Sequence, residues 1–136
     1  MRIWDDNEFP LAYLITFRTY GTWLHGDERG WYAKQRPIVE RTIREVCDFR
    51  GWKVSAINVR TNHAHVVVSA ATVPEKVMKD FKAYATRGLR TAGLWNFSHS
   101  PWVDGGSKRY LWSETSVTNA CEYVVNGQGA DLPESF

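Results

Sequence analysis

Two hydrophobic periods alternate along the chain, and they separate expected strands from expected helices. Runs rich in β-branched and aromatic residues, with side chains alternating between faces, predict strands over residues 11–18, 52–60, 62–69 and 109–112. Apolar residues spaced three and four apart predict helices over residues 37–49 and 74–90, and a last one from Glu114 or Thr115 to about Asn126. Because only Arg60 and Thr61 separate the second and third strands, these two form an antiparallel hairpin.

The resulting order, β-α-β-β-α-β-α, predicts an α+β fold of the ferredoxin-like or RRM-like split βαβ type. It has an antiparallel sheet with helices on one face and a further C-terminal helix. Pro37 is expected at the first position of its helix and Gly51 as a C-terminal cap. The aromatic segments 19–32 and 91–108 are expected to be loops, the second too long for a plain connector. Residues 1–136 are expected to form one catalytic domain.

Composition narrows the class of protein without defining it. The apolar fraction of 43% and the charged fraction of 24% are ordinary for a globular protein, and no apolar run reaches transmembrane length. The acidic N-terminal residues do not form a signal peptide, so a cytoplasmic protein without membrane contacts and with free thiols at Cys47 and Cys121 is expected. The net charge of +2 neither requires nor excludes nucleic acid, whereas the seven Trp exceed what one core needs.

The third strand carries the most suggestive chemistry, in the run NHAHVVVS at residues 62–69. Side chains alternate along a strand, so His63 and His65 point to one face while Ala64 and Val66 point to the other. The two imidazoles are about 7 Å apart along the strand and can bind one metal ion. A His-x-His pair is also compatible with an ordinary half-exposed polar face.

The helix at 74–90 presents a basic arc opposite its buried stripe. This arc comprises Lys79, Lys82, Arg87 and Arg90. Such an arc suits a phosphate backbone, although charged exteriors are common among helices.

Taken together, these features resemble the HUH-type single-tyrosine transposases of small insertion sequences and the REP-associated tyrosine transposases. The resemblance covers nearly the whole chain. It rests on an Asn-His-hydrophobic-His run, a lysine-bearing helix and a late tyrosine motif, found here as NHAHVVV (62–68), VMKDFK (77–82) and YVVNGQ (123–128). The run TFRTYGTWL (16–24) is also similar to a subgroup of the family.

The resemblance implies that Tyr123 is the catalytic nucleophile and that His63 and His65 bind a divalent cation. The family usually has its third metal ligand four residues after the tyrosine, where this chain has Gly127. Asn126 and Gln128 are the candidates, and Gln128 is preferred because its longer amide reaches further. A second departure is Arg60-Thr61, where relatives often have Met-Pro.

The implied reaction is cleavage and rejoining of single-stranded DNA that has hairpin ends. Tyr123 would form a 5′-phosphotyrosine and release a 3′-OH, with Mg²⁺ or Mn²⁺ as the expected cofactor, although imidazoles alone would permit zinc. The helix residues Lys79, Lys82, Arg87 and Arg90 would contact DNA. Asn62 would contact a phosphate or orient a histidine. Insertion-sequence members commonly form homodimers, whereas REP-associated members can be monomers.

Two other functions fit the sequence. A non-catalytic RRM-like module would bind single-stranded nucleic acid by stacking, independently of metal. A small metal-dependent hydrolase without a DNA substrate would show little salt dependence in substrate binding.

Overall fold

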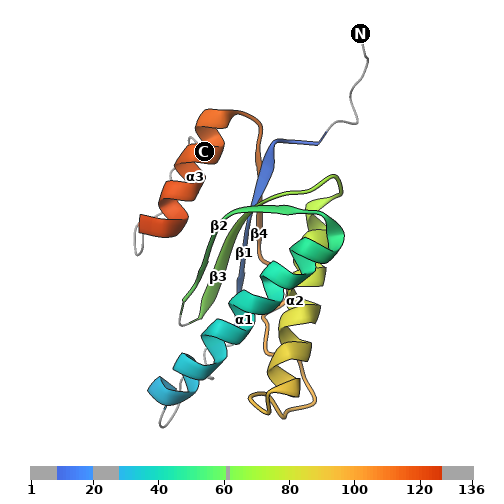
Figure 1. Cartoon of the computed structure of the whole chain (residues 1–136), viewed down its shortest axis with the longest axis vertical. Coiled ribbons are helices and arrows are strands. Elements are labelled where there is room, and N and C mark those ends of the chain that lie inside the picture. The colour runs from blue at the N-terminus through green and yellow to red at the C-terminus, as the bar shows by residue number, and fades with distance from the viewer. Residues whose placement is uncertain (1–8, 20–27, 61, 127–136) are drawn as a thin grey trace.

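The computed structural model describes residues 9–19, 28–60 and 62–126, and it has the predicted order of elements. The elements are β1 (Ala12–Arg18), α1 (Glu28–Arg50), β2 (Lys53–Val59), β3 (His63–Ser69), α2 (Pro74–Thr91), β4 (Ser107–Leu111) and α3 (Glu114–Asn126). The strands form one antiparallel sheet in the order β2-β3-β1-β4 (Figure 1). The predicted α+β fold is therefore confirmed.

Helices cover the two faces of the sheet unequally. Both α1 and α2 pack on one face, while α3 packs on the other, as Figure 1 shows. The larger core lies under α1 and α2 and includes Ile15, Phe17 and Val66, which are fully buried. The smaller core lies under α3 and joins Val67 of β3 to Val124 of the helix. Strand alternation thus divides each strand between two cores.

The first helix begins earlier than predicted. Because α1 starts at Glu28, Pro37 lies inside it, and the expected loop over 19–32 is wrong for residues 28–32. Residues 20–27 lie outside the described residues. Tertiary packing holds the part of the helix just before Pro37, because Gln35 is 1% exposed and its Nε2 donates a hydrogen bond to the carbonyl of Leu94. Gly51 ends α1 with φ of 77°, as expected of a C-terminal cap.

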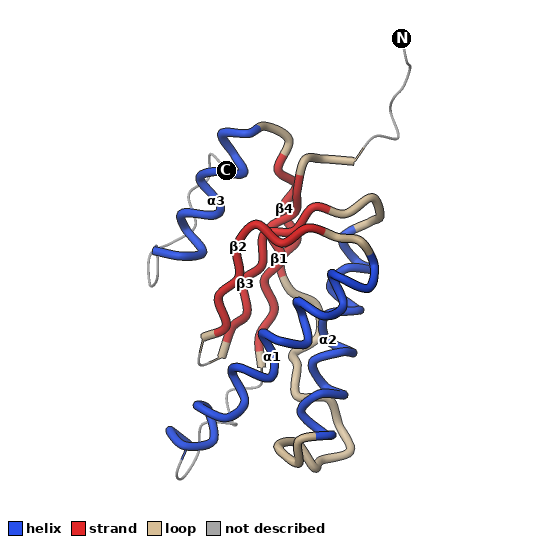
Figure 2. The backbone as a smooth tube through the Cα atoms, viewed as in Figure 1, coloured by secondary structure: helices blue, strands red, loops and turns tan. Residues whose placement is uncertain are grey.

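The long segment between α2 and β4 (Figure 2) is partly structural. Trp95 and Trp102 are buried in the larger core. The indole N–H of Trp102 donates to Thr86 Oγ1 at 2.9 Å, so this part of the segment is fixed to α2. These two tryptophans therefore belong to the core, so they are not among the Trp that the sequence indicated to be in excess of what the core needs.

Both cysteines are free thiols, as predicted. Cys47 is buried, and burial raises the pKa of its thiol to about 12. Within the described part of the chain, no helix combines the length and the apolar character needed to cross a bilayer.

Candidate functional site

The two histidines of β3 lie side by side on the face that carries α3. Ala64 and Val66 are buried in the larger core on the opposite face, as strand alternation requires. The rings of His63 and His65 are nearly parallel, with centroids 5.6 Å apart. The two imidazoles are therefore close enough to act on one bound group.

Hydrogen bonds orient both rings through their Nδ1 atoms. His63 Nδ1 lies 2.6 Å from Asn62 Oδ1. An amide oxygen only accepts, so Nδ1 of His63 carries the proton and Nε2 keeps its lone pair. His65 Nδ1 lies 3.0 Å from Thr16 Oγ1, and the hydroxyl oxygen can accept in the same way. Histidines that bind metal ions usually donate one ring N–H to a hydrogen-bond acceptor, which leaves the lone pair of the other ring nitrogen available for the metal.

The surroundings keep both imidazoles neutral at pH 7. Burial lowers the pKa of His65 to about 4, and electrostatic interactions with His63 and Arg60 add to the effect. Burial also lowers the pKa of His63, together with the charges of Arg18 and Arg60. Neutral imidazole is the form that binds metal ions, so the pair fits a divalent cation.

Tyr123 reaches this pair from α3. Its ring meets the ring of His65 edge to face, with centroids 5.7 Å apart and planes at 86°. The helix begins where Ser113 Oγ accepts a hydrogen bond from the backbone N–H of Ser116, a side-chain cap at the N-terminus. Ala120 and Val124 anchor the helix in the smaller core. His65 and Tyr123 are 58 residues apart in the sequence. The fold nevertheless brings the two histidines and the tyrosine into one cluster.

A polar row across three strands supports the cluster. Thr16 and Asn58 are the partners of His65 in the register with β1 and β2. The side-chain amide of Asn58 donates to the carbonyl of Val124 at 2.9 Å, which connects β2 to α3. Sequence reasoning missed both contacts. Their pairing depends on strand register, and the signal available was only a polar residue within each apolar strand.

Arg18 is a further cation at this site that sequence reasoning missed. It lies opposite His63 in the register between β1 and β3, and its side chain is exposed. Its charge contributes to the lowered pKa of His63. An exposed guanidinium beside this cluster adds to a potential that attracts phosphate groups.

The third expected metal ligand is not defined. Asn126 is the last residue of α3 and is exposed, while Gln128 lies outside the described residues. Among residues 9–19, 28–60 and 62–126, no group of three or more His, Cys, Asp or Glu side chains is close enough to hold a metal ion.

The basic arc of α2 lies on the other side of the sheet, and two of its members contact the segment before β4. Lys82 donates to the carbonyls of Val103 and Gly105, and Arg90 lies 3.4 Å from the carbonyl of His99. Arg87 lies over the ring of Tyr84, and Lys79 is exposed. Of the five expected DNA contacts, Asn62 alone belongs to the histidine cluster, where its side-chain oxygen faces His63.

The fold and this cluster match a known class of proteins that carry out DNA transposition. The family described as "Transposase IS200 like" matches residues 28–124, which include both histidines and the tyrosine. The chain therefore belongs to the IS200-like transposases, the Y1 tyrosine type expected from the sequence. Comparison with curated proteins finds no significant match.

Solved structures show the same fold at low sequence identity. A candidate transposase from Deinococcus radiodurans R1 is 16% identical, with a TM-score of 0.58, over 96% of this chain and 100% of that one. A REP-associated tyrosine transposase bound to a REP hairpin is 11% identical, with a TM-score of 0.61, over 91% of this chain and 70% of that one. At these identities the likeness concerns the fold.

Proposed function

We propose that this protein cleaves and rejoins single-stranded DNA through a covalent bond between Tyr123 and a 5′-phosphate. The observation that carries the proposal is the ring contact between His65 and Tyr123, which joins an oriented, neutral imidazole pair to a hydroxyl nucleophile. Membership of the transposase family supports DNA as the substrate. The neighbour bound to a REP hairpin supports a substrate with hairpin ends.

His63 and His65 would hold a divalent cation, Mg²⁺ or Mn²⁺, with an amide oxygen from Gln128 or Asn126. When bound, the cation supplies Lewis-acid stabilisation of negative charge on the phosphate oxygens. Arg18 adds a fixed positive charge beside His63. Asn62 and Thr16 keep the imidazoles in the tautomer and orientation that binding requires.

In the cleavage step, the hydroxyl oxygen of Tyr123 attacks phosphorus. The new bond joins Oη of Tyr123 to phosphorus, and the bond from phosphorus to the 3′ oxygen breaks. The tyrosine loses its proton, and the departing 3′ oxygen gains one and leaves as a hydroxyl. Because the phosphodiester energy is kept in the phosphotyrosine, a second 3′-OH can reverse the step and join a new strand without ATP.

A covalent-adduct assay tests the proposal. A labelled single-stranded oligonucleotide with a hairpin is incubated with protein and Mn²⁺, and the adduct is detected as a band that survives SDS. Tyr123→Phe and His63→Ala are expected to abolish the band. Tyr84→Phe, which alters a partly buried tyrosine on α2, is the matched control and should retain it. A band that persists in Tyr123→Phe would show that another residue is the nucleophile.

The same assay separates this function from the non-catalytic alternative. An RRM-like module would bind the oligonucleotide with equal affinity in EDTA and in Mn²⁺, and His65→Ala would leave binding unchanged. A strand transferase, by contrast, loses its adduct in EDTA and also loses it in His65→Ala.

A further inference from the structure

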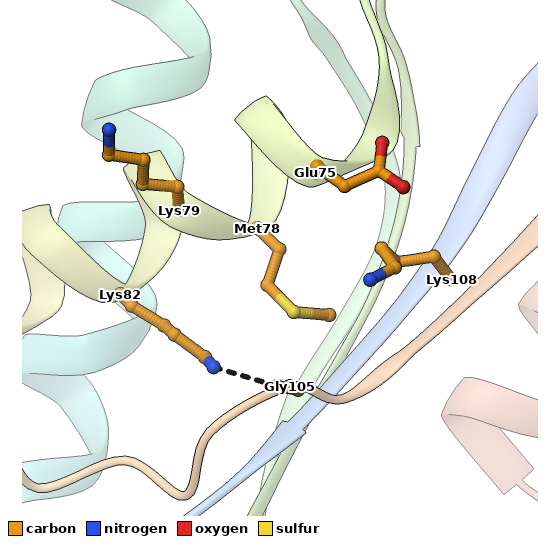
Figure 3. A pocket seen from close by; sticks show the side chains of 6 residues that line it. All are labelled: Glu75, Met78, Lys79, Lys82, Gly105 and Lys108. Carbon is orange, nitrogen blue, oxygen red and sulfur yellow. Dashed lines mark hydrogen bonds between the residues drawn. The ribbon is translucent and has the colours of Figure 1, made fainter.

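A basic pocket lies beside the edge strand β4, on the face of the sheet that α2 covers. Its volume is about 270 Å³. It is lined by Glu75, Met78, Lys79, Lys82, Gly105 and Lys108 (Figure 3). Lys82 of α2 and Lys108 of β4 point toward this pocket, whereas the side chain of Lys79 points away from it (Figure 3).

Gly105, just before β4, lines this pocket, and Gly106 follows it. A Cβ atom on Gly106 would lie 2.5 Å from the carbonyl oxygen of Thr16 and 2.7 Å from Cε of Met78, so no larger residue fits there. The Lys82 ammonium donates a hydrogen bond to the carbonyl of the neighbouring Gly105 at 2.7 Å (Figure 3). Lys82 is therefore held at the pocket rather than free in solvent.

Lys82 and Lys108 line the same pocket, so their positive charges repel one another. Burial lowers the pKa of Lys82; the carboxylate of Asp104 opposes this effect, and the charge of Lys108 adds to it. An anion placed between the two ammonium groups would offset both the repulsion and the lost hydration. The pocket therefore favours an anionic group small enough for its volume, such as a phosphate.

Two stacked aromatic rings continue from the pocket along β4. Lys108, Tyr110 and Trp112 alternate along the chain, so they lie on one face at steps of about 7 Å. Tyr110 is 46% exposed and Trp112 is 60% exposed. Their rings stack with centroids 6.0 Å apart and planes at 20°. Tyr13 meets Tyr110 edge to face at 5.2 Å and holds it in place.

We propose that the lysine pocket and the Tyr110–Trp112 pair form a binding site for unpaired DNA. A backbone phosphate occupies the pocket beside Lys82 and Lys108, and neighbouring bases stack on Trp112 and Tyr110. Unpaired DNA is the fitting ligand because exposed ring faces stack on the faces of bases, which a continuous duplex keeps covered. The inference rests on the proposed function and gives it a second DNA contact, on the sheet face opposite the His63, His65 and Tyr123 cluster.

Fluorescence anisotropy with a labelled oligothymidylate of about twelve nucleotides tests the site. EDTA is present, so cleavage does not contribute. Trp112→Ala should weaken binding about 5- to 100-fold, as expected when one base loses its stacking partner. Lys108→Ala should weaken it and reduce the slope of log K against log salt by about 0.7. Glu75→Gln should tighten binding because it removes the negative charge from the pocket.

Lys53 is an exposed lysine on the opposite edge strand, β2. Lys53→Ala is therefore the matched control and should bind like the unaltered protein. If Trp112→Ala and Lys108→Ala also bind like Lys53→Ala, the site is wrong. The proposal is equally overturned if Glu75→Gln weakens binding, or if a fully paired duplex of similar length binds more tightly than the oligothymidylate and loses as much on Trp112→Ala.

This outcome is separable from the test of the proposed function. Anisotropy in EDTA reports binding alone, whereas the adduct assay reports the reaction of Tyr123. Failure of the unaltered protein to form a covalent adduct would reject strand transfer, whereas normal adduct formation with unaffected pocket variants would reject only the second DNA contact.

Discussion

The side-chain amide of Asn58 in β2 donates a hydrogen bond to the backbone carbonyl of Val124 in α3, across 2.9 Å. Asn58 also lies opposite His65 in the strand register. Val124 belongs to the last turn of α3, where carbonyls have no partner within the helix. The bond therefore links the strand beside the histidines to the residue that follows Tyr123.

Replacing Asn58 should impair catalysis through the position of α3. Asn58→Leu keeps the approximate size of the side chain but leaves the carbonyl of Val124 without this donor. We expect it to cost about 1–3 kcal/mol in the free energy of unfolding. Adduct formation should slow at least tenfold, while oligonucleotide affinity in EDTA, measured by anisotropy, stays within twofold. Ser55→Ala, an exposed site on the same strand, is the control. Adduct formation at the normal rate in Asn58→Leu would exclude this positioning role.

Asn62 is expected to act on the metal site rather than on DNA directly. Asn62→Ala removes the acceptor for Nδ1 of His63, so Mn²⁺ affinity should fall about 10- to 100-fold. Oligonucleotide affinity in EDTA should not change. The opposite pattern, with normal Mn²⁺ affinity and weaker binding in EDTA, would instead identify Asn62 as a phosphate contact.

The identity of the third ligand can be decided by two single substitutions. Gln128→Ala should lower Mn²⁺ affinity at least tenfold more than Asn126→Ala does, because the longer amide is expected to supply the oxygen. Both variants keep the imidazole pair. His65→Ala removes one of the two imidazoles, so it shows how far Mn²⁺ affinity falls when the site is lost. A larger effect of Asn126→Ala would reverse the assignment.

The two lysines predicted to contact DNA from α2 should differ in what they stabilise. Lys82→Ala removes hydrogen bonds to the carbonyls of Val103 and Gly105, so it should lower the free energy of unfolding by about 1–3 kcal/mol and also weaken DNA binding. Lys79→Ala alters an exposed side chain and should weaken DNA binding without a change in stability. Urea unfolding and anisotropy measure the two effects. Equal stability of both variants would contradict this distinction.

Local patterns in the sequence predicted the elements of the sheet and the shared face of His63 and His65, whereas Tyr123 was selected by the family resemblance. Strand alternation alone places His63 and His65 on one face, and the helical spacing of Ala120 and Val124 turns Tyr123 toward the sheet. The start of α1 was not predictable in this way. The rule that favours proline at a first helical turn pointed to Pro37, whereas α1 begins at Glu28 and Gln35, ahead of the proline, is buried against the α2–β4 segment.

Contacts set by register and tertiary packing lay beyond sequence reasoning. Thr16 and Asn58 meet His65 only because β1 and β2 flank β3 in one particular register. Likewise, nothing local indicated that Lys82 would contact the carbonyls of the α2–β4 segment. The basic arc was thus predicted as a free surface, while part of it contributes to the fold.

The most direct test of strand transfer through Tyr123 is mass-spectrometric mapping of the covalent adduct. After reaction with the hairpin oligonucleotide and Mn²⁺, the protein is digested and the peptide that carries the nucleotide is fragmented. We predict a 5′-phosphate linked to Tyr123, with a free 3′-OH on the other DNA product. A nucleotide attached to a different residue, or a linkage through a 3′-phosphate, would contradict the account.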